Sequence, residues 1–285
     1  MNNKIDLHVH TCVSDGRLTP QEIVELAYQQ GVGLLAIADH DSVDAVVPAI
    51  EAARQYSCLK VIPAVELSSH SPGNEVHILG YFIDCDSPTL CRELRTLRES
   101  RQERAKAMVL KLQAMGLDIS LERVQQIAGE GSIGRPHIAQ ALMEKGLVSD
   151  FREVFDKYIG QGGPAYVDRH KLSPEQAIGL VLDSRGIPVL AHPTTANIYE
   201  LLPGMLAAGL MGLEVYYKDY LPDTRQELAN LARKHRLIAT GGTDYHGIEE
   251  TEVMLGCSGV PHTVETRLFA LAAKKGIPLS GDCDE

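Results

Sequence analysis

The sequence lacks a C-x-x-C pair, an excess of basic residues and any apolar run of membrane-spanning length. Without C-x-x-C, we expect neither a zinc ribbon nor a thioredoxin-like redox motif. Lys and Arg number 27 against 38 Asp and Glu, which gives a net charge of -11. An acidic chain is poorly suited to extended DNA binding, although a small local basic site stays open. No apolar run approaches the roughly 20 residues of a transmembrane helix, so we expect no membrane partner.

We also expect no secretory leader, because the N-terminus runs directly into an apolar strand pattern. Six cysteines occur, namely Cys12, Cys58, Cys85, Cys91, Cys257 and Cys283. In a chain without a leader they indicate free thiols in a reducing compartment. We therefore expect a cytoplasmic protein, and the sequence leaves its oligomeric state open. The 285 residues, 44% of them hydrophobic, suffice for one large domain or for one domain with a modest insertion.

Short apolar runs alternate with helical patterns in two parts of the chain. Thr19-Pro20-Gln21-Glu22 and Ser173-Pro174-Glu175-Gln176 are capping boxes, which predict helix starts. A further helix is predicted from about Val43 to Tyr56. The alternation predicts a parallel α/β sheet or barrel. The seven expected strands are Ile5–Val9, Leu34–Ala38, Val61–Val65, Val76–Phe82, Val189–Ala191, Leu213–Tyr216 and Leu237–Thr240.

Between the fourth and fifth expected strands the pattern is helical, charged and free of strand signals. A stripe at helical spacing runs through Leu90, Leu94, Leu97, Met108 and Leu112. A Gly-rich loop at 160–164 marks the return. We expect residues 1–86 and 164–285 to form the α/β domain and residues 87–163 to form a helical insertion that serves as a substrate-binding lid.

Ligand-type residues stand where the expected strands end. His8 and His10 are two apart, so both side chains point to the same face of a strand. One histidine at a strand end is usually a surface or hydrogen-bonded residue, and Asp39 and Asp41 could be helix caps. The positions taken together favour a metal site at the end of the barrel where active sites form. The others are Asp15, His40, Glu66, His192, Asp244 and His246, together with His77, which lies inside the fourth expected strand.

These segments resemble the polymerase and histidinol phosphatase (PHP) family. The motifs are Asp6-Leu7-His8-Val9-His10-Thr11, Ser14-Asp15-Gly16, Asp39-His40-Asp41, Glu66, His77, His192-Pro193 and Asp244-Tyr245-His246. The resemblance implies a distorted (β/α)7 TIM-like barrel and three divalent metal ions, which are manganese, iron or zinc. It implies three ligand sets: His8, His10, Glu66 and Asp244 for one ion, Glu66, His77 and His192 for the second, and Asp15, His40 and His246 for the third.

The same resemblance implies a metal-dependent phosphoesterase. Ions would neutralise the phosphate, and the nucleophile would be a hydroxide that bridges two of them. His192, Asp244, His246 and Asp15 are the expected catalytic residues, because a ligand His or Asp could protonate the leaving oxygen.

Gly134-Arg135-Pro136-His137 in the insertion is similar to a segment of the family's 3′,5′-nucleotide bisphosphatases and RNase AM-type 5′→3′ exoribonucleases. Arg135 would fork onto a substrate phosphate, with His137 as a second donor. The alternative is that Pro136 only opens a helix and Arg135 is solvated.

Three further substrate contacts are expected around the cleft. Arg101 lies near the apolar stripe and could point into the cleft. Tyr217 could stack a base and Lys218 could contact phosphate. Both could equally cover the barrel rim.

The expected partner is a small phosphorylated nucleotide or a short RNA. We expect conversion of adenosine 3′,5′-bisphosphate to AMP and phosphate, or removal of nucleotides from the 5′ end of short 5′-phosphorylated RNA. The alternatives are a histidinol-phosphatase-like monoesterase and a barrel that binds metal without catalysis.

Overall fold

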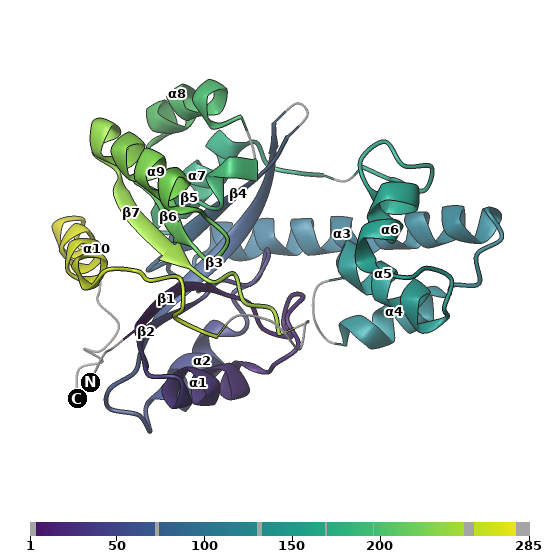
Figure 1. The fold of residues 1–285 in the computed structure, drawn as a ribbon, viewed down its shortest axis with the longest axis horizontal. Coiled ribbons are helices and arrows are strands. Elements are labelled where there is room, and N and C mark those ends of the chain that lie inside the picture. The colour runs from purple at the N-terminus through teal and green to yellow at the C-terminus, as the bar shows by residue number, and fades with distance from the viewer. Residues whose placement is uncertain are drawn as a thin grey trace.

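A curved sheet of seven strands forms the centre of the protein (Figure 1). The structure is a computed structural model that describes residues 4–71, 74–129, 133–168, 170–195, 197–247 and 254–277. The strands lie side by side in chain order. They are β1 (Lys4–Val9), β2 (Val32–Ile37), β3 (Lys60–Ser71), β4 (Asn74–Tyr81), β5 (Ile187–Leu190), β6 (Gly212–Tyr217) and β7 (Ile238–Gly242).

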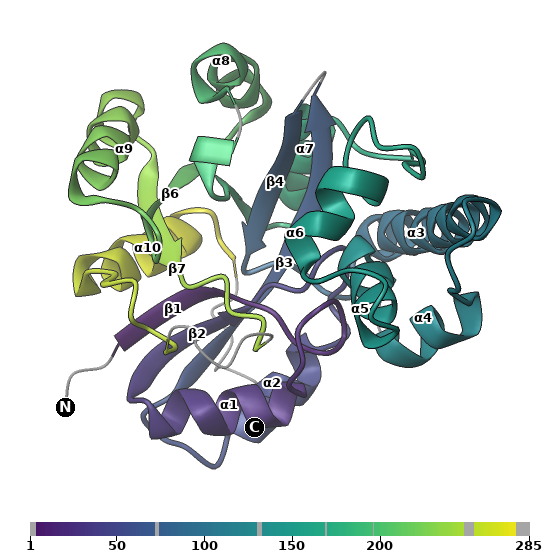
Figure 2. The ribbon, with the colours of Figure 1, turned by 45° about the vertical axis from the view of Figure 1, so that its right-hand side comes forward.

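The first and last strands of the sheet meet, so the sheet forms a nearly closed barrel. Val9 and Tyr245 form a parallel bridge. The amide of Asp244 donates to the carbonyl of His8 at 2.8 Å, and the amide of His10 donates to the carbonyl of Tyr245 at 2.9 Å. Figure 2 shows β1 beside β7. The expected distorted (β/α)7 barrel is thereby confirmed.

Strand β4 runs antiparallel to both β3 and β5, whereas the other neighbouring pairs are parallel. The expected parallel arrangement is wrong at this strand. Only two residues separate β3 from β4, and a parallel crossover needs about a dozen. Strand β3 also continues to Ser71 rather than ending at Val65, the expected limit. The start of β4 therefore lies at the barrel end where the parallel strands finish.

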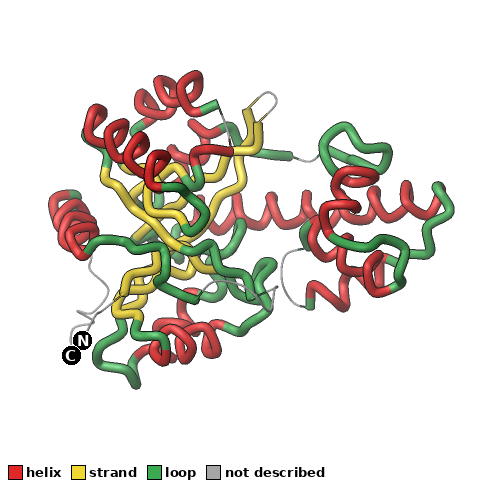
Figure 3. The backbone as a smooth tube through the Cα atoms, viewed as in Figure 1, coloured by secondary structure: helices red, strands yellow, loops and turns green. Residues whose placement is uncertain are grey.

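Helices cover the outside of the barrel (Figure 3). Thr19 and Ser173 form the two expected capping boxes at the starts of α1 and α7. The interior is apolar, with Ile5, Leu34 and Leu79 almost fully buried in one cluster. The outer helices are α1 (Pro20–Gln29), α2 (Val46–Ala53), α7 (Pro174–Asp183), α8 (Ile198–Ala208), α9 (Pro222–His235) and α10 (His262–Lys274).

The chain between β4 and α7 is helical and extends to one side of the barrel (Figure 1). Helix α3 joins the two parts, since Leu90 packs in a barrel core whereas Met108 packs in a separate core of the insertion. No helix in the described ranges is both long and apolar enough to cross a bilayer. The limits expected for the insertion, 87–163, stay a prediction. Its helices are α3 (Pro88–Ala114), α4 (Leu121–Ala128), α5 (Arg135–Glu144), α6 (Phe151–Val154) and the π-helix Phe155–Ile159.

Candidate metal centre

The nine expected ligands converge at the end of the barrel where the parallel strands finish. Glu66, 1% exposed, lies at their centre. Its Oε1 is 2.9 Å from Nδ1 of His77 and 3.1 Å from Nε2 of His192. Its Oε2 is 2.9 Å from Nδ1 of His40 and 3.4 Å from Nε2 of His10. One carboxylate thus faces imidazoles from β4 and from the loops after β1, β2 and β5, which suits a ligand shared between cations.

His8 and Asp244 complete this part of the cluster. Nε2 of His8 lies 3.4 Å from Oε1 of Glu66 and 3.5 Å from Oδ1 of Asp244. The same Asp244 oxygen lies 3.1 Å from Nε2 of His10. Backbone pairing of β1 with the residues after β7 brings Asp244 to these two histidines.

Asp15 gathers a second group of ligands on the side facing the insertion. Its Oδ1 is 3.4 Å from Nε2 of His246, and its Oδ2 is 3.8 Å from Nε2 of His40. His10 lies between the two groups, with Nδ1 3.8 Å from Oδ1 of Asp15 and its ring stacked on that of His246. The cluster therefore has more than one place where imidazole and carboxylate atoms face a common point.

Several buried imidazole nitrogens face carboxylates without a hydrogen bond, which indicates that these residues fit metal ions. Nε2 of His8, both ring nitrogens of His10 and Nδ1 of His40 are buried without a hydrogen bond. Buried polar atoms normally have partners, and imidazole and carboxylate are ordinary ligands of first-row divalent ions. In the described part of the chain, three groups bring ligand atoms within 4.8 Å of one another. They are His10, Asp15, His40 and His246; His8, His10 and Glu66; and His40, Glu66 and His77.

The electrostatics of the cluster favour bound cations. Burial alone would raise the pKa of Glu66, but the facing imidazoles of His40, His77 and His8 hold it well below its usual value. Burial and the neighbouring His246 lower the pKa of His10 to about 4, so this imidazole is in the neutral form that binds metals. Burial opposes protonation of His77, yet Glu66 raises its pKa to about 10. The carboxylates thus supply negative charge that a cation would compensate.

Three residues of the site have a left-handed backbone, which is uncommon for residues other than glycine. The φ angles are 52° at Asp41, 25° at His192 and 51° at Asp244. Each follows a strand directly or closely, where the chain must turn sharply. Backbone strain of this kind concentrates at functional sites.

Glu214 contacts two of the expected ligands, and the sequence analysis did not identify it. It is fully buried on β6. Its Oε1 lies 3.1 Å from Nδ1 of His8, and its Oε2 accepts from the amide of His192 at 2.7 Å. A carboxylate that holds the second nitrogen of a ligand histidine is a common outer-shell partner of metals. The available signal was one acidic residue inside an apolar strand.

Asp39 and Asp41 are not helix caps, because α2 begins only at Val46 and has no side-chain cap. Asp39 accepts from the amide and the hydroxyl of Thr11, each at 2.7 Å, and from the hydroxyl of Ser14 at 2.5 Å. Asp41 accepts from the amide of Ser68 at 2.9 Å. The two carboxylates therefore tie the metal-site loops together.

Arg101, Tyr217 and Lys218 all lie next to the cluster. Arg101 is buried and donates to Oδ2 of Asp41 through Nε at 2.8 Å and Nη2 at 2.6 Å. Tyr217 donates its hydroxyl to Oδ2 of Asp244 at 3.0 Å, and Nζ of Lys218 lies 3.4 Å from the carbonyl of Asp244. Their expected substrate contacts stay predictions.

Arg135 and His137 lie at the start of α5, where Pro136 opens the helix as the alternative reading expected. Nη2 of Arg135 donates to Oε2 of Glu75 at 2.8 Å, so this arginine is paired rather than merely solvated. Nδ1 of His137 accepts from the amide of Gly134 at 2.9 Å. Glu75 stands two residues before His77 on β4, which connects the insertion with the metal cluster.

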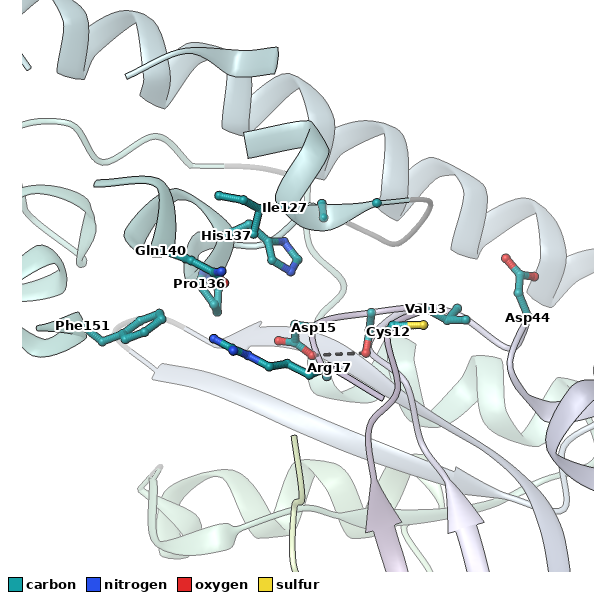
Figure 4. A pocket seen from close by; sticks show the side chains of 14 residues that line it. Cys12, Val13, Asp15, Arg17, Asp44, Ile127, Pro136, His137, Gln140 and Phe151 are labelled. Atoms are coloured by element: carbon teal, nitrogen blue, oxygen red, sulfur yellow. Dashed lines mark hydrogen bonds between the residues drawn. The ribbon is translucent and has the colours of Figure 1, made fainter. Parts of the chain in front are cut away.

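A cleft of about 660 Å³ separates the insertion from the loop after β1. Figure 4 shows Asp15 and Arg17 on the barrel side, with His137, Gln140 and Phe151 on the insertion side. Asp15 belongs both to this cleft and to the ligand cluster. The cleft therefore opens onto the candidate ligands.

Comparisons with known proteins agree with this geometry. The family model described as PHP domain matches residues 6–161. The chain is 38% identical over 247 residues to the 5′-3′ exoribonuclease Rnm of Escherichia coli, covering 85% of this chain and 84% of that protein. It is 35% identical over 248 residues to the 3′,5′-nucleoside bisphosphate phosphatase of Chromobacterium violaceum, covering 85% and 87%.

A solved structure named as a metal-dependent phosphoesterase, from Bifidobacterium adolescentis, has a TM-score of 0.87 at 29% identity and covers 99% of both chains. The barrel, the ligand cluster and these relatives define a metal-dependent hydrolase of phosphoric esters. The chain belongs to the PHP domain family, as the resemblance implied.

Proposed function

We propose that the protein hydrolyses a phosphoester at the 3′ position of a nucleotide that also carries a 5′-phosphate. The substrates are nucleotide 3′,5′-bisphosphates, such as adenosine 3′,5′-bisphosphate, and short 5′-phosphorylated RNA cleaved from its 5′ end. The observation that carries the proposal is the cleft, which joins the ligand cluster through Asp15 to the Gly134-Arg135-Pro136-His137 segment through His137. The named activities of the two relatives support both substrates.

Three divalent ions, manganese, iron or zinc, form the proposed cofactor set. His8, His10, Glu66 and Asp244 would hold one, Glu66, His77 and His192 the second, and Asp15, His40 and His246 the third. Bound ions neutralise phosphate charge and lower the pKa of water, so that water attacks phosphorus at neutral pH. The short distances from Glu66 to imidazoles of several strands support its role as the shared ligand.

Protein groups at the cluster rim would protonate the leaving 3′-oxygen. His192, Asp244, His246 and Asp15 are the proposed catalytic residues. The side chains of His192 and His246 are 15% and 19% exposed, so both reach the surface of the cluster. Tyr217 would hold Asp244 in place through its hydroxyl and offer its ring to a base, and Lys218 beside it would contact phosphate.

The insertion would bind the part of the substrate that is not hydrolysed. His137 faces the cleft, and Arg135 stands beside it, paired with Glu75. A guanidinium can form a two-pronged contact to phosphate. Arg101 would add positive charge behind the cluster while it remains bound to Asp41. The free cysteines of the described ranges suit the cytoplasm, where we propose that the reaction occurs.

A phosphate-release panel with added manganese tests the proposal. It compares adenosine 3′,5′-bisphosphate, a 5′-phosphorylated dinucleotide and histidinol phosphate. We expect AMP and phosphate from the first, nucleotide release from the second and slow turnover of the third. His192→Ala should lower kcat by at least about a hundredfold. Preferred turnover of histidinol phosphate would establish the monoesterase instead, and no turnover of any phosphoester would leave a metal-binding barrel without catalysis.

A further inference from the structure

Arg17 is an exposed cation whose base is fixed next to the metal cluster. It lies two residues after Asp15, in the loop between β1 and α1, and lines the cleft. Its amide donates to the carbonyl of His246 at 2.8 Å, and the amide of Gly16 donates to the carbonyl of Thr11 at 2.9 Å. These two backbone hydrogen bonds fix the loop next to Asp15 and His246, and the guanidinium of Arg17 lies at the surface of the cleft.

The guanidinium of Arg17 extends under Pro136 toward Phe151, across the cleft from His137 (Figure 4). Among the residues that the structure describes, none of the ion pairs within 4.0 Å involves Arg17. The pKa of Glu144 is lowered mainly by its hydrogen bond from Arg123 at 2.8 Å, and the charge of Arg17 adds to this effect. Arg17 thus differs from the other arginines near the site, which have carboxylate partners.

Those partners limit what the other arginines can offer to a substrate. Arg101 is bound to Asp41, Arg98 to Asp44 and Arg135 to Glu75. An anion that approaches them must compete with a carboxylate. Within the described ranges, no carboxylate forms an ion pair with Arg17 that an anion there would have to displace. In a chain with net charge -11, an available cation beside the cluster has a large effect on where phosphate binds.

We propose that Arg17 binds the substrate phosphate that is not hydrolysed, from the barrel side of the cleft and opposite His137. The inference rests on the proposed function and adds a specificity-determining residue to it. Arg17 would let the site select substrates with a second phosphate over simple monoesters. A guanidinium offers paired donors that match two phosphate oxygens.

Kinetics of Arg17→Ala, in the manganese-loaded full chain, test the proposal. We expect KM for adenosine 3′,5′-bisphosphate to rise at least about tenfold with kcat nearly unchanged, because a charge-assisted contact is lost. Turnover of adenosine 3′-monophosphate, which lacks the second phosphate, should change less than twofold. Arg17→Lys keeps the charge without the fork and should lie between the two. Equal effects on both substrates, or none on the bisphosphate, would overturn the proposal.

Arg95→Ala is the matched control, since it removes the same charge from an exposed position on α3 outside the cleft. It should leave both KM values unchanged. Binding of AMP and of adenosine to the loaded enzyme, measured by calorimetry, separates this proposal from the proposed reaction. Arg17→Ala should weaken AMP at least about tenfold and leave adenosine unchanged. This result is expected even if adenosine 3′,5′-bisphosphate is not a substrate, whereas unchanged AMP affinity contradicts the role of Arg17.

Discussion

Individual buried carboxylates in this protein have specific hydrogen-bond partners. These contacts fix the positions of the candidate ligand residues. Glu214 contacts His8 and the backbone of His192, whereas Asp39 binds the loop that carries Asp15. A side chain that never touches the substrate can therefore decide where a ligand atom lies.

Glu214→Gln should weaken metal binding without unfolding the protein. The amide keeps the shape of the carboxylate, but it cannot supply two negatively charged acceptors to His8 and to the amide of His192. We expect the affinity for the ion that we propose His8 to hold to fall roughly 10- to 100-fold. Metal content after dialysis against limiting manganese measures the effect, with the exposed Glu25→Gln as control. Wild-type metal content in the Glu214 variant would show that this contact has no influence on the site.

Arg101→Ala should destabilise the protein strongly. It removes the buried guanidinium that is bound to Asp41, a fully buried carboxylate. Removing one partner of a buried pair costs about 3–5 kcal/mol. Arg98→Ala, one turn earlier on α3, breaks the more exposed pair with Asp44 and should cost at most about 1 kcal/mol. Urea denaturation of both variants gives the two free energies of unfolding, and similar losses would contradict the distinction between buried and exposed pairs.

Among the elements, β1 and β7 pack very closely near the site. Gly242 at the end of β7 lies directly against His8, where a Cβ atom would be 2.4 Å from the Cβ of His8 and 2.5 Å from its nitrogen. Contacts that short do not occur, so the strands can approach this closely only because residue 242 has no side chain. Barrel closure and the position of His8 are therefore linked.

Gly242→Ala should separate β1 from β7 and displace His8. We expect a loss of about 1–3 kcal/mol of stability, as for other overpacked sites, together with reduced metal content. Gly179→Ala is the control, because a Cβ atom in this part of α7 meets nothing within 4 Å. Alanine there should stabilise the helix by up to about 1 kcal/mol. Thermal unfolding and metal analysis of both variants test the link, and normal metal content in the Gly242 variant would refute it.

At the scale of the whole molecule, the metal cluster connects distant parts of the chain. The proposed ligands come from β1, β3 and β4 and from the loops after β1, β2, β5 and β7. Ions bound there would hold these elements together in the folded state. Unfolding separates the ligands, so metal binding favours the fold.

Removal of the ions should lower both activity and stability. A ligand at a hundred times its dissociation constant stabilises the folded state by about 2.7 kcal/mol. We therefore expect chelation to abolish phosphoester turnover and to lower the melting temperature by several degrees. Added manganese should restore both, and chelator already saturated with manganese should have no effect. An unchanged melting temperature after verified removal of all ions would contradict a structural contribution of the metals.

Much of the fold was predictable because its signals are local. The capping boxes at Thr19 and Ser173 mark helix starts within four residues, and apolar runs mark the strands. The direction of β4 was missed, although a Ser71-Pro72-Gly73-Asn74 segment indicated a short connection. His77 was expected in the site without a reason for its place inside a strand. The antiparallel direction supplies that reason.

The amino-acid sequence by itself determined which chemistry is available: the imidazoles and carboxylates, their spacing along the strands and the glycines that let backbones approach. Only the tertiary structure decided which charged side chains are paired. It pairs Glu214 with His8 and Asp41 with Arg101, and it places Arg17 at the surface of the cleft. The physical reason is range. Ligand type and helix capping depend on a few neighbouring residues, whereas the pairing of buried charges depends on contacts between residues tens to hundreds of positions apart.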